Sequence, residues 1–415
     1  MFQVLIGASH AFCGTFVAGP GDTLYNESSQ VVYAREDGRT TLTLANDFTG
    51  DVNDFAVIIP VPSSLDEDGV RVVDPSLVTE LDSFSSPRLV EYTCEDLWWP
   101  PYEPTRSLGC MTDYNIQASA DGFRSTDSAS TVQVEATFTE GEYAFTLLSA
   151  DEGDDLQDWF DAHGYEVGAD AEDMLQDYID EGSWFLAARV QLSGHGDGPE
   201  WLSPIQLSYE SEGMSLPIRL GTLNSDGMQE LILYGITAEG DGALGIANLP
   251  QTDIDTDCML DDTLTGWYRG KLDQVENEWV VEHSWSPYHC DPCTPGGTLD
   301  PELVTELGVD DEYPHFSRIF VRYDADQSED LQLYSSGMYD QTQRRYIRYD
   351  SNLESQFRIC DQLDVLDDGG NCDEEWEALD QDHEADQGRG CSSGHSRFAM
   401  AGLAMLAGLA LRRRR

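Results

Sequence analysis

Positive charge is what this 415-residue sequence has least of. Its 22 Lys and Arg residues stand against 79 Asp and Glu residues, for a formal net charge of -57, and Lys271 is its one lysine. A surface this negative repels phosphate backbones, so the composition argues against nucleic acid as a partner. Two interpretations of the acidity stay open, a saline habitat or a cation-binding surface, and the even spread of acids over the loops favours the first.

Signs of catalysis are equally scarce. We find no Cys-His protease signature, and among 79 acids no pair of carboxylates can be assigned as a catalytic acid and base. The sequence therefore predicts no catalytic residue. A hydrophobic content of 40% with 10% aromatic residues still indicates a folded, globular protein.

Nine cysteines are the first feature present in excess. Most lie in loop-like sequence, as disulfides do in proteins of an oxidising compartment. The disulfide candidates are Cys94, Cys110, Cys290, Cys293, Cys360 and Cys372. Proximity in the chain favours Cys94–Cys110 and Cys360–Cys372, but other pairings stay open.

The same region offers an alternative, a metal site. His283, His289, Cys290 and Cys293, with Cys258, have the ligand types of a tetrahedral zinc site. A structural disulfide, zinc and redox activity all remain open for the cysteines, and the disulfide is favoured because an exported Cys-x-x-Cys pair usually oxidises. The zinc interpretation is the basis of the alternative function, an exported metal-dependent hydrolase.

Calcium is the second metal alternative. Aspartates alternate in two places, at Asp253, Asp255 and Asp257 and at Asp324, Asp326 and Asp330. The first set lacks the glycine and the bidentate glutamate of an EF-hand. Chance alternation in an acidic chain is the simpler explanation, so we predict no cofactor.

The N-terminal residues 1–11 predict a truncated signal peptide. A short apolar run precedes Ala-Ser-His-Ala, which has the small-x-small form of a signal-peptidase site. The basic n-region and a longer apolar core are missing. A buried N-terminal strand is the alternative.

The C-terminal residues 391–415 predict a sorting or anchor segment. Gly390 and Cys391 precede an apolar stretch, residues 398–411, which as a helix spans only about 21 Å. Its large apolar residues include Phe398, Leu403, Leu406, Leu409 and Leu411, and the basic stop is Arg412, Arg413, Arg414 and Arg415. Four arginines favour the cytoplasmic side of a membrane.

This order of Cys, short apolar helix and arginines is similar to the myxobacterial-type C-terminal sorting domain. The resemblance implies cleavage near Cys391 by an intramembrane sorting protease and retention at the outer membrane or cell surface through the modified cysteine. An ordinary short anchor helix is the alternative, and both place the preceding protein outside the cytoplasm. Residues 361–390 hold 12 acids and one Arg, and we expect them to be a disordered acidic linker or stalk.

Strand signals dominate the rest of the chain. β-branched and aromatic residues alternate or form apolar runs in residues 31–33, 40–44, 54–62, 132–138, 143–148, 184–192, 205–209, 216–223, 230–236, 279–282, 319–323, 331–334 and 346–349. A short helical insertion has apolar faces at residues 156–160 and 171–179. The pattern predicts an α+β, β-rich fold of largely antiparallel sheets, with an N-terminal β-rich domain at 12–150 and a second α+β domain of the same ectodomain at 151–350.

Several phrases, in this order, carry a second resemblance. They are Cys13-Gly14, residues 55–62, Gly182-Ser183-Trp184-Phe185, Leu202-Ser203-Pro204-Ile205, residues 216–220, His289-Cys290-Asp291-Pro292-Cys293 and residues 316–323. Together they are similar to a bacterial family of unknown function, number 2330, over residues 13–349. The resemblance implies export and frequent surface attachment, and it implies no catalytic residue.

One loop invites a binding hypothesis. Trp98, Trp99 and Tyr102 lie with two prolines between Cys94 and Cys110. Aromatic side chains on a stiff loop can stack on a sugar or hold a protein partner, although packing against the core is the alternative. We therefore expect an exported, surface-anchored protein whose ectodomain binds a surface ligand or serves the cell envelope structurally.

Overall fold

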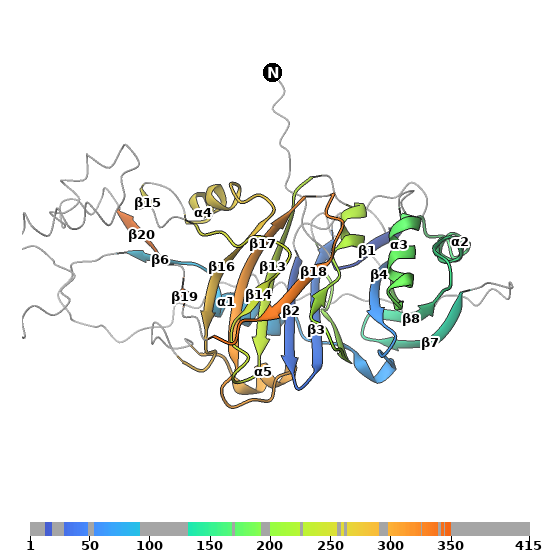
Figure 1. Cartoon of the computed structure of the whole chain (residues 1–415), viewed down its shortest axis with the longest axis horizontal. Helices are drawn as coiled ribbons and strands as arrows, with labels where there is room; N and C mark the ends of the chain where they lie inside the picture. Colours follow the sequence, from blue (N-terminus) through green and yellow to red (C-terminus); the bar gives the residue numbers. More distant parts are fainter. Residues whose placement is uncertain are drawn as a thin grey trace, which may run out of the picture. The chain divides into compact units, whose positions relative to one another are not determined.

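Figure 1 shows the computed structural model, which describes residues 13–18, 29–48, 54–91, 132–167, 171–191, 200–224, 227–254, 259–260, 264–289, 298–324, 326–338, 342–343 and 345–349. Contacts divide the chain into two units. The main unit takes Met1–Pro87, Cys110–Ile254 and Lys271–Arg344, and the second unit takes Arg88–Gly109, Asp255–Gly270 and Arg345–Arg415. The domain boundary that we expected at residue 150 lies inside the main unit.

A five-stranded antiparallel sheet forms one layer of the main unit, in the order β1-β4-β9-β8-β7. Its strands are β1 (Thr15–Ala18), β4 (Asp54–Pro62), β7 (Gln133–Glu140), β8 (Tyr143–Ser149) and β9 (Ser183–Gln191). β4 is the predicted apolar run, and it is buried on both faces: Val57 and Ile59 enter one core cluster, Ala56 and Ile58 another. The predicted β7–β8 hairpin is confirmed.

The two predicted helices cover the outer face of this sheet. They are α2 (Gly153–Ala162) and α3 (Ala171–Asp180). Their apolar residues Leu156, Phe160 and Leu175 are buried with the outer side chains of β4 and β9. Gly164 ends the first helix with a φ of +86°, the left-handed conformation that glycine adopts without strain.

A nine-stranded sheet forms the second layer, in the order β19-β16-β17-β13-β2-β3-β11-β5, with β10 paired to β3. Its strands are β2 (Ser29–Glu36), β3 (Arg39–Phe48), β5 (Val70–Val72), β10 (Glu200–Trp201), β11 (Ile205–Glu210), β13 (Gln229–Thr237), β16 (Glu278–Trp285), β17 (His315–Tyr323) and β19 (Thr342–Gln343). Every pair is antiparallel except β13 with β2. The Asp37-Gly38 turn between β2 and β3 has positive φ at both residues, as a tight hairpin requires.

Two short helices, which we did not predict, cover the outer face of the nine-stranded sheet. They are α1 (Ser76–Ser85) and α5 (Pro301–Glu306), and η1 (Glu67–Gly69) precedes β5. The chain enters both α1 and α5 through Asp-Pro, and the two helices share the phrase Asp-Pro-x-Leu-Val-Thr-Glu-Leu, at residues 74–81 and 300–307. The threonine hydroxyl of each phrase donates to the carbonyl of its proline, at 3.2 Å and 3.1 Å, and the Leu and Val residues of both enter one core cluster. This repeated phrase was the signal that could have revealed the helices.

The two large sheets share a core, because the largest cluster takes side chains from the inner faces of both. A small sheet, β12-β18-β14, adds apolar side chains to that core. Its strands are β12 (Ser215–Leu216), β14 (Leu244–Ile246) and β18 (Leu331–Ser335). The main unit is therefore layered, with a helix pair outside each large sheet.

The predicted strand at 216–223 is wrong. After the two residues of β12 the chain turns into a 3-10 helix, η2 (Arg219–Asn224). Pro217 lacks an N–H donor, and the N–H groups of Ile218 and Arg219 donate to the Asp330 carboxylate at 2.9 Å and 3.1 Å. With those groups occupied, the segment cannot continue a strand ladder.

The second unit contains a three-stranded parallel sheet in the order β15-β20-β6. Its strands are β6 (Arg88–Glu91), β15 (Met259–Leu260) and β20 (Arg345–Tyr349), and α4 (Leu264–Leu272) begins in this unit. The strand expected at 346–349 is confirmed.

The β-rich, largely antiparallel fold class is confirmed. The predicted signal peptide at 1–11, the acidic stalk and the C-terminal hydrophobic helix lie outside the described residues. Among the helices that the structure describes, none is both long and apolar enough to cross a bilayer.

Candidate functional site

Most residues that the sequence singled out lie outside the described ranges. They are Cys94, Trp98, Trp99, Tyr102, Cys110, Cys258, Cys290, Cys293, Cys360, Cys372, Gly390, Cys391, Phe398, Leu403, Leu406, Leu409, Leu411, Arg412, Arg413, Arg414 and Arg415. His283, His289 and the aspartates Asp253, Asp324, Asp326 and Asp330 can be placed. The structure therefore bears on the metal hypotheses in part, and on the disulfide and anchor hypotheses not at all.

The two histidines have different surroundings. His283 is buried in β16, with its ring centroid 5.0 Å from that of Phe84 and 5.6 Å from that of Phe316. His289 lies exposed on a turn that follows β16. Across the described ranges, no group of three His, Cys, Asp or Glu residues could hold a metal ion.

The aspartates of the second calcium candidate have separate protein partners. Asp324 accepts a hydrogen bond of 2.6 Å from the Asn277 side-chain amide, whereas Asp330 binds Tyr178 and Arg219. Their carboxylates therefore do not converge on one cation. In the first candidate set, Asp253 accepts from the N–H of its neighbour Ile254.

A buried ion cluster lies between α1 and the nine-stranded sheet. A β-bulge in β16 makes Glu282 an extra residue, because pairing with β17 stops at Val281 and resumes at His283. The bulge turns the Glu282 carboxylate toward Arg318, whose Nε donates to it at 2.5 Å. Arg318 Nη1 also donates to Asp82 at 2.6 Å and to the Tyr234 hydroxyl at 3.2 Å. We call these four residues the Arg318 cluster.

The charged groups of the Arg318 cluster interact strongly because water is largely excluded from them. The side chains of Arg318 and Glu282 are 8% and 1% exposed. Burial alone would lower the pKa of Arg318, but Tyr234, Glu282 and Asp82 together raise it. Burial also raises the pKa of Tyr234, against the opposing effect of Arg318. Arg318 thus stays charged, and one guanidinium holds two carboxylates across three elements.

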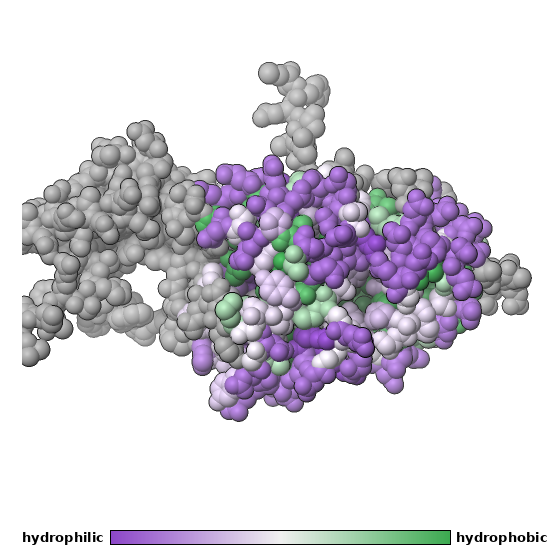
Figure 2. Space-filling model, in the orientation of Figure 1, coloured by the Kyte–Doolittle hydropathy of each residue, from purple (hydrophilic) through white to green (hydrophobic). Residues whose placement is uncertain are grey.

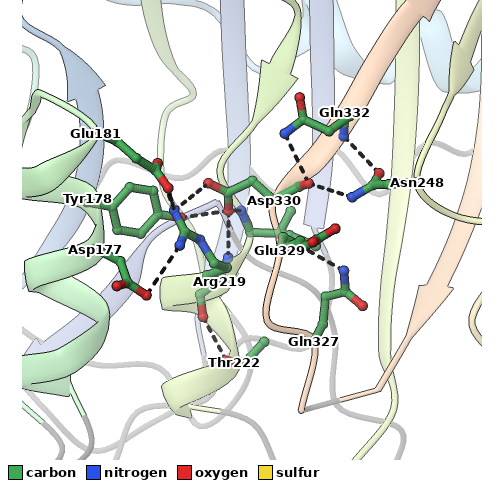
Figure 3. Close-up of polar contacts among 11 residues, drawn as sticks. Asp177, Tyr178, Glu181, Arg219, Thr222, Asn248, Gln327, Glu329, Asp330 and Gln332 are labelled. Atoms are coloured by element: carbon green, nitrogen blue, oxygen red, sulfur yellow. Dashed lines mark hydrogen bonds and ion pairs between the residues drawn. The ribbon is translucent and has the colours of Figure 1, made fainter.

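A second ion cluster, drawn in Figure 3, joins α3, η2 and the loop before β18. The guanidinium carbon of Arg219 lies 4.1 Å from the centre of the Tyr178 ring. The guanidinium also forms three ion pairs, with Asp330 at 3.3 Å, Glu181 at 2.9 Å and Asp177 at 3.7 Å. The Tyr178 hydroxyl donates to Asp330 Oδ1 at 2.7 Å. We call these five residues the Arg219 cluster.

Asp330 is the centre of the Arg219 cluster. Its Oδ1 accepts from the Tyr178 hydroxyl and from two backbone N–H groups, and its Oδ2 faces Arg219 Nη2. Burial, followed by the charge of Asp330, raises the pKa of Tyr178. A carboxylate with this many donors is held in place.

Ser284 and His315 form a pair that sequence reasoning missed. The Ser284 hydroxyl lies 2.8 Å from His315 Nε2, the spacing of a nucleophile and its base. Both residues are fully buried, on the paired strands β16 and β17. Because no reactant reaches two buried side chains of a packed sheet, we assign the pair to strand packing.

A glycine phrase of the G-x-G-x-x-G type occupies residues 240–245. It follows β13, but it leads into β14 instead of a helix, so it lacks the helix N-terminus that binds a pyrophosphate. A Cβ at Gly242 would lie 2.4 Å from the Met338 backbone, and one at Gly245 would lie 2.5 Å from the Tyr334 ring. These glycines are needed for close packing.

Of the nine cysteines, Cys13 is the one within the described ranges. Its thiol is free and fully buried in the core shared by the two sheets. Burial, and then the charge of Asp330, raises its pKa. The folded protein therefore holds the thiol proton more tightly than the unfolded chain does. The stability that this difference contributes is complete below the ordinary thiol pKa of 9.0 and is lost as the pH rises above it.

We expect Cys13 to resist iodoacetamide in the native protein at pH 8 and to react rapidly in 8 M urea, because only unfolding exposes the thiol. Mass-spectrometric mapping of the Cys13 peptide gives the extent of modification under each condition. Equal rates in native and denatured protein would contradict this burial.

Figure 2 shows one face of the molecule, on which hydrophilic residues predominate. Among the described residues, the exposed large apolar side chains are Val134, Tyr313, Tyr334 and Met338. Single exposed apolar residues are usual on a soluble surface.

Comparison with solved structures finds a likeness to the crystal structure of baculovirus P35. The identity is 12%, the TM-score is 0.26, and the match covers 53% of this chain and 65% of that one, so this chain spans less than two thirds of its length. A likeness at this TM-score carries no argument.

No curated protein matches the chain. A family described as "Uncharacterized protein conserved in bacteria (DUF2330)" matches residues 7–333, which include both ion clusters and every strand of the two large sheets except β19. The phrases that suggested this resemblance lie in the matched segment, and the description names no activity. The chain therefore belongs to the DUF2330 family.

Proposed function

We propose that this chain is an exported bacterial protein, held at the cell surface through Cys391, whose folded part binds a surface ligand or serves the envelope structurally. The observation that carries the proposal is the order of Gly390 and Cys391, the short apolar stretch at 398–411 and the four arginines that follow. An apolar segment too short for a stable span, closed by arginines, suits a signal that is cut after insertion. A sorting protease is then the processing partner.

The acidic surface supports the proposal. With a net charge of -57, the protein repels other copies of itself and remains solvated when many copies are displayed at high density. Residues 361–390, with 12 acids, would keep the folded part at a distance from the attachment point.

The folded part supports a binding role more than a catalytic one. In the Arg318 and Arg219 clusters, the buried carboxylates Glu282 and Asp330 are already held by internal donors. Such groups stabilise a rigid scaffold. The aromatic loop with Trp98, Trp99 and Tyr102 is the segment that we propose for contact with a ligand.

Replacing Cys391 with alanine is expected to release most of the protein from the cell surface. Without the thiol, no modified cysteine retains the chain after cleavage. Surface protease accessibility and intact mass of the protein from the membrane fraction measure the two consequences. The wild-type mass should lack the residues after Cys391 and carry an added group of lipid size.

Ser392→Ala is the matched control, because it changes a neighbouring small residue without removing the thiol. Wild-type surface levels for Cys391→Ala would exclude attachment through that residue. A wild-type mass that retains Arg412 to Arg415 would identify a simple membrane anchor instead.

A further inference from the structure

β7 is an open strand edge on the five-stranded sheet. It ends the sheet, and no residue that the structure describes pairs with its outer side. Six of its eight residues are exposed, and Ala136 and Phe138 are half-buried. The opposite edge strand, β1, is buried at Thr15, Phe16 and Val17, and the edge strands β5 and β19 of the larger sheet have three and two residues. β7 therefore offers a long, accessible row of backbone donors and acceptors.

The register of β7 with β8 indicates which backbone groups face the open edge. Glu140 pairs with Tyr143, so a two-residue turn joins the two strands. Gly141, the first residue of this turn, has a φ of +57°, as a type II′ turn requires. The residues that flank such a turn bond to each other, and bonded and non-bonded pairs alternate along an antiparallel ladder. Counted back from the turn, the N–H and C=O groups of Thr137 and Thr139 therefore point away from β8.

The two faces of the sheet differ beside this edge. On the inner face, the half-buried Phe138 ring stacks on that of Phe145, with the ring centroids 5.2 Å apart. On the outer face, α2 and α3 cover the sheet (Figure 1), and from Gln133 to Asp180 the sequence holds 15 acids and no Lys or Arg. A strand added to β7 thus meets apolar surface on one face and a negative field on the other.

The acids of β7 argue against a second copy of this chain as the occupant. Acidic side chains and bulges on an edge strand are devices that prevent identical edges from pairing. β7 has Glu140 at its end and Glu135 at a bulge, where pairing with β8 stops at Val134 and resumes at Ala136. Two copies, each with a net charge of -57, also repel one another. A basic strand is attracted by the same charges, so the edge discriminates in its favour.

We propose that β7 binds an extended, basic segment of a partner protein as an additional strand. The backbone of this segment bonds to Thr137 and Thr139, its apolar side chains lie beside Phe138, and its alternate Lys or Arg side chains lie on the acidic outer face. Main-chain bonds supply the affinity, and the alternation of side chains supplies the specificity. The partner is then the surface ligand of the proposed function, so the inference rests on the binding role stated there and not on attachment at Cys391.

The test is the binding of defined peptides to the full-length chain. The probe is a fluorescent heptapeptide, Lys-Val-Lys-Val-Lys-Val-Lys, with blocked ends, and anisotropy measures its dissociation constant. A version with proline in place of the central valine keeps the charge but loses a donor, so its affinity should be about tenfold lower. A version with glutamate in place of every lysine should not bind. The affinity of the basic peptide should also fall as the salt concentration rises from about 50 to 500 mM.

Thr139→Pro blocks the same edge from the side of the protein. Because the N–H group of Thr139 points away from β8, proline leaves the β7–β8 ladder intact, as prolines on edge strands do. Binding of the basic peptide should again fall about tenfold. Thr139→Val is the matched control, because it keeps the N–H group and a β-branched side chain and should bind as the wild type does. Urea unfolding checks that both variants are folded, and amide exchange at Thr137 and Thr139 should slow when the peptide binds.

Equal affinity of the wild type for the basic peptide and its proline version would reduce the interaction to attraction by charge and would overturn strand addition. Equal binding by the wild type and a folded Thr139→Pro variant would overturn it as well. A wild-type dimer in sedimentation velocity that Thr139→Pro dissociates would make a second copy the occupant, against the proposal. If Thr139→Pro unfolds, the comparison of the two peptides on the wild type decides.

The peptide assay involves no processing of the chain, so its result is separate from that of Cys391→Ala. Surface loss of Cys391→Ala without peptide binding leaves attachment standing and removes the strand partner. Peptide binding with wild-type surface levels of Cys391→Ala keeps the strand partner and removes attachment at Cys391.

Discussion

Replacing Arg318 with alanine is expected to lower the free energy of unfolding by about 3–5 kcal/mol. Arg318 is the one basic member of the Arg318 cluster, and its removal takes the guanidinium away from Glu282, which is 1% exposed. A buried carboxylate that loses its partner must either stay charged in a poorly solvated place or take up a proton. Either outcome costs stability.

Urea denaturation followed by tryptophan fluorescence measures the change, and amide exchange in β16 and β17 locates it. Arg39→Ala is the control, because Arg39 and Glu210 form an exposed ion pair of 2.7 Å on the same sheet. Exposed pairs contribute less than about 1 kcal/mol. A loss for Arg318→Ala no greater than that of Arg39→Ala would contradict the role assigned to the cluster.

A companion variant tests whether the loss comes from the uncompensated charge. Arg318→Met with Glu282→Leu replaces both charged members of the buried pair by apolar side chains of similar volume. Replacing a buried ion pair by neutral groups is often nearly neutral for stability. We therefore expect this variant to recover much of the loss seen in Arg318→Ala, whereas an additive loss would mean that packing dominates.

The sequence predicted the elements whose burial is periodic over many residues. The run at 54–62, the β7–β8 hairpin and the apolar faces of α2 and α3 are confirmed because one or both of their faces enter a core. α1 carries a similar signal in Leu77, Val78, Leu81 and Phe84, which all enter one core cluster, although we did not predict this helix. α5, at six residues, is too short for periodicity to identify.

The ion clusters could not be predicted, for a different reason. Asp82 and Arg318 are 236 positions apart, and nothing in the sequence distinguishes Asp82 or Glu282 from the other 77 acids. The bulge that turns Glu282 toward Arg318 is also invisible to a pattern of period two. One signal was available: Arg318 directly precedes the apolar run Ile-Phe-Val of β17, and an arginine inside a buried strand usually has a partner.

Asp330→Ala is expected to destabilise the main unit by about 2–4 kcal/mol. The substitution removes the acceptor of the Tyr178 hydroxyl at 2.7 Å, the acceptor of two backbone N–H groups, and an ion pair of Arg219 at 3.3 Å. Arg219, itself 8% exposed, would keep only Glu181 and Asp177, which are 57% and 66% exposed. Thermal or urea unfolding measures the loss.

Asp177→Ala is the matched control within the same cluster. Its carboxylate lies 3.7 Å from Arg219 and is largely exposed, so its removal should cost less than about 1 kcal/mol. Both variants remove one carboxylate and raise the net charge equally, so a difference between them reports burial and hydrogen bonding, not charge. Equal losses would show that Asp330 is no more than another surface acid.

A double-mutant cycle with Tyr178→Phe completes the argument, because it isolates the bond between the Tyr178 hydroxyl and Asp330. If that bond holds α3 to the loop before β18, the double variant should lose less stability than the sum of the two single variants. The difference should be about 1.5–3 kcal/mol, the range for a hydrogen bond to a charged group. Strict additivity would mean that the Tyr178–Asp330 bond does not hold α3 to the loop before β18. Asp330 would then orient η2 through its two backbone bonds, and α3 would be held by its apolar face and by the contacts of Arg219 with Asp177 and Tyr178.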